Sequence, residues 1–329
     1  MNEPPRRPQQ QGLFGPLDEE SPATVRAAPV AADVAALAAA LPRTLRLGTS
    51  SWAFAGWSGF VYAARTVQAR LPRHGLAAYA QHPLLRAVGL DRTFYAPMTG
   101  AELAGLAAVT PADFRFVVKA PSECTDPVRR GDGGRPERSN ERWLDAAFAR
   151  DFAVAPAVQG LGERLGTLVF QFPPQGDLAQ EPARFAARLG AFLGALPKPV
   201  PCAVELRDAA LLTADYAAVL RDAGVQHCYS VHPRMPALSR QLEVVPLTGP
   251  AVVRWLLHPG LGYDEAKARY EPFDRLVDPD PARRADVADL VRRALALSLP
   301  VTVVANNKAE GSAPRTLLEL ARLLVGAAH

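Results

Sequence analysis

Eight short hydrophobic runs recur along this chain, and nearly every run ends on a polar or charged residue. Stretches of helical composition separate most of the runs. This alternation is typical of a TIM-type (β/α)8 barrel, an α/β fold whose parallel strands are buried on both faces. Active sites in such barrels lie at the carboxyl ends of the strands. The eight predicted strands are residues 44–52, 86–95, 114–120, 167–172, 202–207, 225–231, 252–258 and 301–307.

Apolar residues three and four positions apart predict helices after most of these strands. The predicted helices are residues 101–108, 142–153, 182–196, 213–223, 285–299 and 313–325, and Thr213 is a suitable N-cap. A short Ala-rich helix over 31–40 precedes the first strand, and Pro42 ends it. Two connections are long. Residues 121–140 are predicted to form a mobile loop over the barrel mouth, and residues 232–249 carry little regular pattern.

Composition places the chain among globular proteins, because 49% of its residues are hydrophobic and 21% are charged. Its 329 residues suffice for one barrel, which typically needs about 250. We therefore expect a single barrel domain over 43–329. Residues 1–42 are expected to be a disordered tail that includes the short Ala-rich helix.

The expected location is the cytoplasm. The chain has three cysteines without a CxxC pair, so no disulfide framework is predicted. No run approaches the roughly 18 apolar residues of a membrane span, and residues 1–24 lack the apolar segment of a secretory signal. Membrane association is therefore not expected. The net charge of +4 is small for a dedicated nucleic-acid-binding protein.

Charged residues at the strand ends are the first candidates for chemistry. Glu205 and Arg207 are two positions apart on one strand, so they share its interior face. Such a pair is costly to bury unless it is paired or binds a ligand. It is therefore either an internal ion pair that closes the barrel or part of a site. Lys119 has the same two alternatives, and desolvation would lower its pKa and suit it to acid–base work or anion binding.

Two histidines could complete a metal site. His232 and His258 end the sixth and seventh strands, near Glu205 on the fifth. A glutamate and two histidines can ligate a divalent metal. The chain has no HxH or HExxH spacing, and the alternative is that both histidines simply make hydrogen bonds in loops. The sequence identifies no cofactor.

A phosphate site is a further candidate near the carboxyl end of the chain. Gly311 allows close backbone approach, Ser312 is a plausible N-cap, and Lys308 lies beside them. The alternative is a capped helix without a ligand. Two aromatic residues at the mouth, Trp52 and Tyr95, could stack on a ring of a ligand or fill the top of the barrel as core.

Seven sequence blocks in order resemble the DUF72 (YecE-like) family, from Leu45 to the C-terminus. They are GTSSW at 48–52 with Trp57, Gly59 and Tyr62; TFY at 93–95; TP at 110–111 with FRF at 114–116 and Lys119; LGERLG at 161–166 with LVFQFPP at 168–174; ELR at 205–207; Arg254; and NN at 306–307. The resemblance implies a TIM-type barrel of unassigned activity. It also implies that the matched polar positions Lys119, Gln171, Glu205, Arg207, Arg254 and Asn306 converge on one mouth.

Two positions depart from the family pattern. The family commonly has a glutamate and an asparagine before TFY, where this chain has Gly89 and Asp91. It usually has a histidine two residues after the arginine of the seventh strand, and here that residue is Leu256. We expect Asp91 to supply the carboxylate that Gly89 lacks.

Three functions follow from these residues. The first is an enzyme that binds a small anionic substrate, a phosphate or a carboxylate. Glu205 and Lys119 would be catalytic, with Glu205 as the general acid–base. The expected substrate-binding residues are Arg207, Arg254, Gln171, Asn306, Asn307, Thr49, Trp52, Tyr95 and Asp91.

The second function is a metal-dependent phosphoesterase or isomerase that uses Asp91, Glu205, His232 and His258. The third is a non-catalytic protein that holds nucleic acid with the aromatic mouth and the arginines of 129–138. The sequence does not decide whether the protein is an enzyme.

Overall fold

The computed structural model describes residues 25–63, 66–131 and 135–326. Eight parallel strands close into a barrel in the order β1-β10-β9-β8-β7-β6-β3-β2, as the alternating runs predict. The strands are β1 (Leu45–Thr49), β2 (Leu85–Leu90), β3 (Arg115–Lys119), β6 (Leu165–Phe172), β7 (Cys202–Leu206), β8 (Gln226–Val231), β9 (Ala251–Trp255) and β10 (Val301–Ala305).

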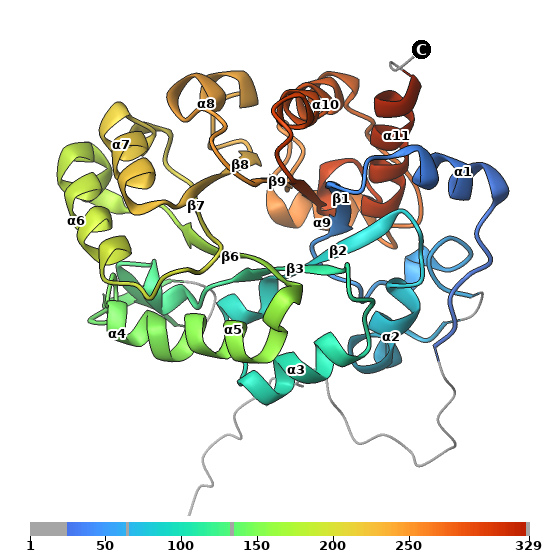
Figure 1. Cartoon of the computed structure of the whole chain (residues 1–329), viewed down its shortest axis with the longest axis horizontal. Coiled ribbons are helices and arrows are strands. Elements are labelled where there is room, and N and C mark those ends of the chain that lie inside the picture. Colours follow the sequence, from blue (N-terminus) through green and yellow to red (C-terminus); the bar gives the residue numbers. More distant parts are fainter. Residues whose placement is uncertain (1–24, 64–65, 132–134, 327–329) are drawn as a thin grey trace, which may run out of the picture.

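Helices surround the barrel and cover the outer face of its strands (Figure 1). They are α1 (Ala32–Ala40), α2 (Leu71–Tyr79), α3 (Gly100–Ala108), α4 (Ala146–Ala149), α5 (Ala155–Leu161), α6 (Pro182–Gly194), α7 (Ala214–Ala223), α8 (Leu238–Val244), α9 (Tyr263–Tyr270), α10 (Pro281–Ala296) and α11 (Ala313–Gly326). Most buried hydrophobic residues lie in the cluster between strands and helices. Within the described ranges, no helix is long and apolar enough to cross a membrane.

A small apolar layer fills the inside of the barrel. It comes from six different strands, because alternate residues of a strand face the same side. Its members are Val117, Val169, Ala203, Cys228, Val252 and Val304. The residue two positions after each member therefore faces the interior one layer closer to the carboxyl ends of the strands.

Several strands end earlier than the hydrophobic runs predict. β2 stops at Leu90, and Asp91–Phe94 forms a 3-10 turn instead of the predicted strand end. The Thr93 hydroxyl donates to the carbonyl of Leu90 and lies 2.6 Å from that of Lys119, which stabilises the turn. β1, β9 and β10 likewise end at Thr49, Trp255 and Ala305, before the predicted residues 52, 258 and 307.

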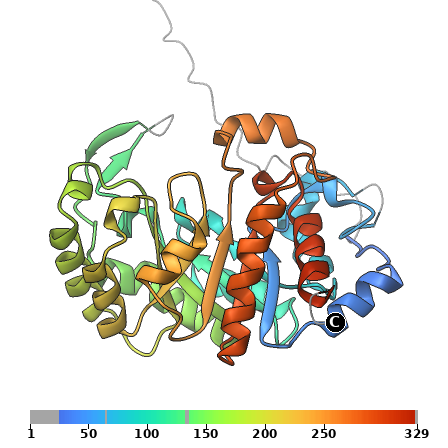
Figure 2. The same cartoon turned by 90° about the horizontal axis from the view of Figure 1, so that it is seen from above.

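The long connection 121–140 is not simply the loop that its composition predicts. β4 (Val128–Arg130) and β5 (Pro136–Ser139) pair in antiparallel fashion within it. Asn140 stabilises the base of this hairpin, because its amide donates to the carbonyls of Glu123 and Asp126. The hairpin and α9 stand on the same side of the barrel (Figure 2). The chain therefore builds a wall at the mouth there.

The predicted helix over 142–153 is shifted and interrupted. Helical structure begins only at Ala146, because the Asp145 carboxylate accepts from the amides of Ala147 and Phe148 as an N-cap. A π-helical turn, Arg150–Val154, then leads into α5, which continues to Leu161.

Residues 232–249 hold more regular structure than the sequence pattern indicates. α8 lies within them and is held by Gln241, whose amide donates to the carbonyls of Ser230 and Pro236. The predicted cap of α7 is confirmed, since the Thr213 hydroxyl accepts from the Tyr216 amide. The Ala-rich helix is present as α1, whereas the predicted disordered tail of residues 1–24 lies outside the described residues.

Candidate active site at the barrel mouth

A ring of polar side chains lies directly above the apolar layer. Each member is two residues after an apolar layer residue, so it faces the interior; five lie on the same strand as that residue, and Asn306 directly follows β10. The ring consists of Lys119, Gln171, Glu205, Ser230, Arg254 and Asn306. Five of these residues are among those the sequence assigns to the mouth. Ser230 is the sixth, and its position two residues after Cys228 was the signal that could have identified it.

Arg254 is the centre of an ion-pair network in this ring. Its Nη1 donates to Glu205 Oε2 at 2.6 Å, and its Nη2 donates to both carboxylate oxygens of Asp91 at 2.6 and 2.7 Å. Arg207 pairs with the other oxygen of Glu205. Asp91 thus supplies a mouth carboxylate from the turn after β2. Arg254 is thus enclosed by its own partners, and its predicted contact with a substrate stays a prediction.

The network keeps Glu205 ionised. Burial opposes the charge, but Arg207, Arg254 and Lys119 outweigh it and lower the pKa of the Glu205 carboxyl to about 2. Burial also opposes the charge of Arg254, and Asp91 and Glu205 outweigh it and raise the pKa of that guanidinium. A carboxylate with 0% exposure and such a low pKa is a poor general acid at neutral pH. Its geometry suits it instead to positioning Arg207 and Arg254.

Lys119 lies in the same ring without such a partner. Its Nζ is 3.7 Å from the centroid of the Phe94 ring, and among the described residues it makes neither an ion pair nor a hydrogen bond. Burial lowers the pKa of Lys119 to about 8, which Asp91 and Glu205 offset only in part. The predicted direction of its pKa shift is confirmed.

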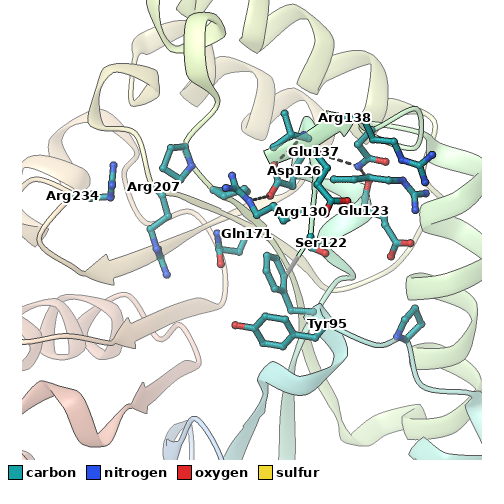
Figure 3. Close-up of a pocket in the computed structure, with 18 of the residues that line it drawn as sticks. Tyr95, Ser122, Glu123, Asp126, Arg130, Glu137, Arg138, Gln171, Arg207 and Arg234 are labelled. Atoms are coloured by element: carbon teal, nitrogen blue, oxygen red, sulfur yellow. Dashed lines mark hydrogen bonds and ion pairs between the residues drawn. The ribbon is translucent and has the colours of Figure 1, made fainter. Parts of the chain in front are cut away.

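A cavity of about 1020 Å³ opens above the ring. Gln171 and Arg207 line it from the strand ends, and Phe94, whose ring lies against Lys119 Nζ, lines it as well. Figure 3 shows Arg207 and Arg234 on one side of the cavity and the hairpin residues on the other, with Gln171 and Tyr95 between them. The hairpin formed by the 121–140 connection is therefore one wall of this cavity.

Positive charge exceeds negative charge along the cavity lining. Among the described residues, five arginines line it against three carboxylates. Arg130 is neutralised by Asp126 at 2.7 Å, but Arg129 and Arg138 on the hairpin make no ion pair within the described ranges. The lining arginines are Arg129, Arg130, Arg138, Arg207 and Arg234, and the carboxylates are Glu123, Asp126 and Glu137. The described lining therefore carries an excess of positive charge.

The two histidines are each engaged in a local hydrogen bond. His232 lines the cavity, and burial together with Arg207 lowers its pKa to about 4. Its Nδ1 accepts from the Arg234 amide, and His258 Nδ1 accepts likewise from the Gly260 amide. The described residues contain no group of three or more His, Cys, Asp or Glu side chains that could hold a metal. Both histidines thus make the loop hydrogen bonds of the simpler alternative.

The segment after β10 is occupied by its own contacts. Asn306 donates to Ser50 Oγ, and Asn307 Oδ1 accepts from the Ala313 amide and from Trp57 Nε1. Asn307 therefore binds the Ala313 amide at the start of α11, where the sequence predicts Ser312 as the cap.

Phosphate binding by Lys308, Gly311 and Ser312 stays a prediction. Lys308 Nζ lies 4.1 Å from the Tyr263 ring centroid. Gly311 is in close contact with the backbone of Arg275 and Val277, and the Ser312 side chain is buried.

The aromatic residues of the mouth divide into core and surface. Trp52 is buried and its Nε1 donates to the carbonyl of Leu71, so it packs against α2 as part of the core. Thr49 is buried as well and bonds to the Tyr79 hydroxyl. Tyr95 is 81% exposed and lines the cavity. Of the two candidates, only Tyr95 has a ring face open to a ligand.

The departures at Gly89 and Leu256 have structural counterparts. A Cβ at Gly89 would lie 3.1 Å from the Ser50 Cα, so the backbone just after β1 is too close for a larger residue without movement. Leu256 is buried in a cluster with Tyr270 and Phe273 beneath α9. An apolar side chain thus replaces a polar one at the edge of the mouth.

These features define a (β/α)8-barrel protein with a charged cavity at the carboxyl ends of its strands. The sequence matches the family described as "Protein of unknown function DUF72" over residues 46–329. The chain therefore belongs to the DUF72 family.

Solved structures of similar proteins support the fold. A DUF72 family protein from Enterococcus faecalis is 19% identical with a TM-score of 0.54, covering 85% of this chain and 97% of its own. One from Thermotoga maritima is 23% identical with a TM-score of 0.54, covering 85% and 98%. The UPF0759 protein YunF of Bacillus subtilis is 31% identical over 134 residues. The matched segment is 40% of this chain, and it spans 42% of the length of this curated relative.

Proposed function

We propose that this protein is an enzyme that binds a small anionic substrate, a phosphate or a carboxylate, at the barrel mouth. The observation that carries the proposal is the juxtaposition of Arg207, Lys119 and a cavity whose arginines outnumber its carboxylates. Arg207 lines this cavity while Glu205 holds it from below. A guanidinium fixed in this way presents its remaining N–H groups to a carboxylate or phosphate.

In this proposal Lys119, rather than Glu205, exchanges the proton. An acid–base group works best when its pKa is near the working pH. The pKa of Lys119 is lowered to about 8 by burial, whereas that of Glu205 is about 2. Glu205 is then a positioning residue, and Gln171 at the cavity floor orients the substrate.

Anion binding is tested by thermal unfolding with inorganic phosphate, pyrophosphate and citrate, each against sodium chloride at equal ionic strength. We expect at least one anion to raise the Tm of the wild-type protein, because binding to the folded state alone stabilises it. Arg207→Gln should lose this increase. Arg221→Gln, at an exposed arginine outside the cavity, should keep it. No increase with any anion, or an equal increase in Arg207→Gln, contradicts the proposal.

Nucleic-acid binding is a second candidate, favoured by Arg129 and Arg138 on the hairpin wall. Phosphate backbones bind such arginines with an affinity that falls steeply as salt rises. A fluorescent single-stranded oligonucleotide titrated at two salt concentrations tests it. Absent or salt-independent binding removes this candidate, as does unchanged binding by an Arg129→Gln/Arg138→Gln variant.

A further inference from the structure

Lys119 is a buried amine that the chain leaves without a polar partner. Its side chain is 7% exposed, and its Nζ lies over the face of the Phe94 ring at 3.7 Å. Over the ranges the structure describes, its Nζ is in no ion pair and no hydrogen bond. A buried lysine is almost always paired, since an isolated charge is costly to desolvate. The presence of such a lysine at the barrel mouth suggests that its amine has a chemical role.

The carboxylates near Lys119 are already engaged by other groups. Asp91 accepts both of its hydrogen bonds from Arg254, and Glu205 is shared between Arg254 and Arg207. Their charges still act on Lys119 through space. The amine is therefore stabilised as a cation by nearby charge, yet no carboxylate holds it in place. A group in this position can lose its proton without breaking an ion pair.

The neutral amine is accordingly present in useful amounts. With a pKa of about 8, roughly a tenth of Lys119 is unprotonated at pH 7, against less than a thousandth for an ordinary lysine. An unprotonated lysine in an apolar pocket beside other cations is an activated nucleophile toward carbonyl carbon. Phe94 supplies the apolar contact, and Arg207 and Arg254 are the neighbouring cations.

We propose that Lys119 forms a Schiff base with an anionic carbonyl compound, an α-keto acid or a phosphorylated aldehyde, whose charged group is bound by Arg207. This inference rests on the proposed anion site and adds the substrate class and the covalent step. Arg207 lines the cavity from the end of β7, and Lys119 ends β3 on the same mouth. One small molecule with both an anionic group and a carbonyl would engage both residues.

The step balances without an external reductant or oxidant. The Nζ lone pair attacks the carbonyl carbon and forms a C–N bond, while the carbonyl π electrons move to oxygen. A proton passes from nitrogen to that oxygen, which gives a carbinolamine. The hydroxyl then takes up a proton from solvent, equivalent to the one that the Lys119 ammonium released, and leaves as water while the nitrogen lone pair forms the C=N bond. The protonated imine carries the same positive charge as the ammonium, so Asp91 and Glu205 stabilise it equally well.

Lys308 provides a matched comparison within the same chain. It is also 7% exposed, and its Nζ also lies over an aromatic ring, that of Tyr263 at 4.1 Å. Neither lysine is itself among the residues that line the mouth cavity, but the ring over Lys119, that of Phe94, lines it, whereas the Tyr263 ring over Lys308 does not. If burial over a ring were enough for reaction with a carbonyl compound, both lysines would react. The proposal requires that only Lys119 does.

The test is reductive trapping on the full-length protein. Pyruvate and pyridoxal phosphate are incubated separately with the protein, cyanoborohydride is added, and the adduct is located by peptide mass spectrometry. We expect a saturable adduct at Lys119 that excess inorganic phosphate suppresses. It should be absent in Lys119→Met and retained in Lys308→Met, with folding of both variants checked by thermal unfolding. Adducts only at exposed lysines such as Lys267 would overturn the proposal.

The outcome separates this inference from the proposed function. If phosphate stabilises the protein in an Arg207-dependent way but neither carbonyl probe reacts at Lys119, the anion site stands and the Schiff base is wrong. If no anion stabilises the protein and no adduct forms, both are wrong. If the Lys119 adduct saturates equally in wild type and Arg207→Gln, the role of Arg207 in holding the substrate is wrong.

Discussion

Arg254 and Glu205 form an ion pair at 2.6 Å in which the two residues are 2% and 0% exposed. The pair joins β9 to β7 across the inside of the barrel, with β8 between them. Buried charges are tolerated only when the geometry is good and the remaining donors and acceptors are satisfied. Here Asp91 takes the second nitrogen of Arg254, and Arg207 takes the second oxygen of Glu205. Removal of one member therefore leaves another charge without its partner.

Glu205→Gln should destabilise the protein strongly. The substitution keeps the shape of the side chain but removes the counter-charge of Arg207 and leaves Arg254 with Asp91 alone. Breaking a buried pair in this way costs about 3–5 kcal/mol in the free energy of unfolding. Urea denaturation measures the change. Glu163→Gln, at an exposed glutamate, should change it by less than about 0.5 kcal/mol. A loss no larger than that of the control would show that the network does not stabilise the barrel.

Lys119→Met should stabilise the protein near neutral pH while removing any function that needs the amine. Folding lowers the pKa of Lys119 from 10.5 to about 8, so retaining the charge at pH 7 costs up to about 3 kcal/mol. Between pH 8 and 10.5 the unfolded chain binds more protons than the folded one at this site, so wild-type stability rises through that window. The advantage of Lys119→Met should therefore shrink toward pH 10.5.

Thermal unfolding of wild type and Lys119→Met from pH 7 to 10.5 measures this difference. Lys267→Met, at an exposed lysine, is the control and should differ from wild type by the same small amount throughout. A Lys119→Met difference that does not change with pH would contradict the lowered pKa.

Stability should fall as the pH drops from about 6.5 to 4. Burial lowers the pKa of His82, His227 and His232 to about 4 each. The unfolded chain takes up these protons at its ordinary pKa of 6.5, and the folded chain does not, so acid favours unfolding across this window. Denaturant unfolding at several pH values should show a proton uptake on unfolding that approaches three.

His227→Gln isolates one of these protons. His227 is fully enclosed between the Tyr216 hydroxyl and Gln241, so its proton uptake belongs to the unfolded state alone. The variant should lower the uptake by about one proton between pH 6 and 5, whatever its effect on absolute stability. His74→Gln, at an exposed histidine, is the comparison. An unchanged slope in His227→Gln would show that His227 is protonated in the folded protein.

Gly311→Ala and Gly105→Ala should act in opposite directions. Gly311 has a φ of +116°, and a Cβ there would lie 2.6 Å from the Arg275 carbonyl oxygen. A strained backbone costs about 1–3 kcal/mol before the steric contact is added. Gly105 lies within α3 with nothing within 4 Å of a Cβ, so alanine should stabilise by about 0.5–1 kcal/mol. Urea denaturation of both variants is the measurement, and equal effects would contradict the strain at Gly311.

The convergence of the charged residues was predictable because it follows from local rules. Strand alternation and the common direction of parallel strands place Lys119, Glu205 and Arg254 at one mouth, whatever else the chain does. The fold class followed from the same alternation. Hydrophobicity does not reveal that β2 ends at Leu90, because the turn Asp91–Phe94 depends on the Thr93 hydroxyl, which donates to the carbonyl of Leu90 and lies 2.6 Å from that of Lys119.

The sequence by itself determined the eight strands, their order of alternation with helices and the residues that face the mouth, because these depend on periodicity within short segments. Only the tertiary structure decided which charged residues form ion pairs with one another. Arg254 and Asp91 are 163 residues apart, and no local pattern records that they meet. Burial likewise depends on distant segments. Packing therefore decided that Glu205 is held ionised, that Trp52 is core while Tyr95 is exposed, and that Lys119 is left without a partner.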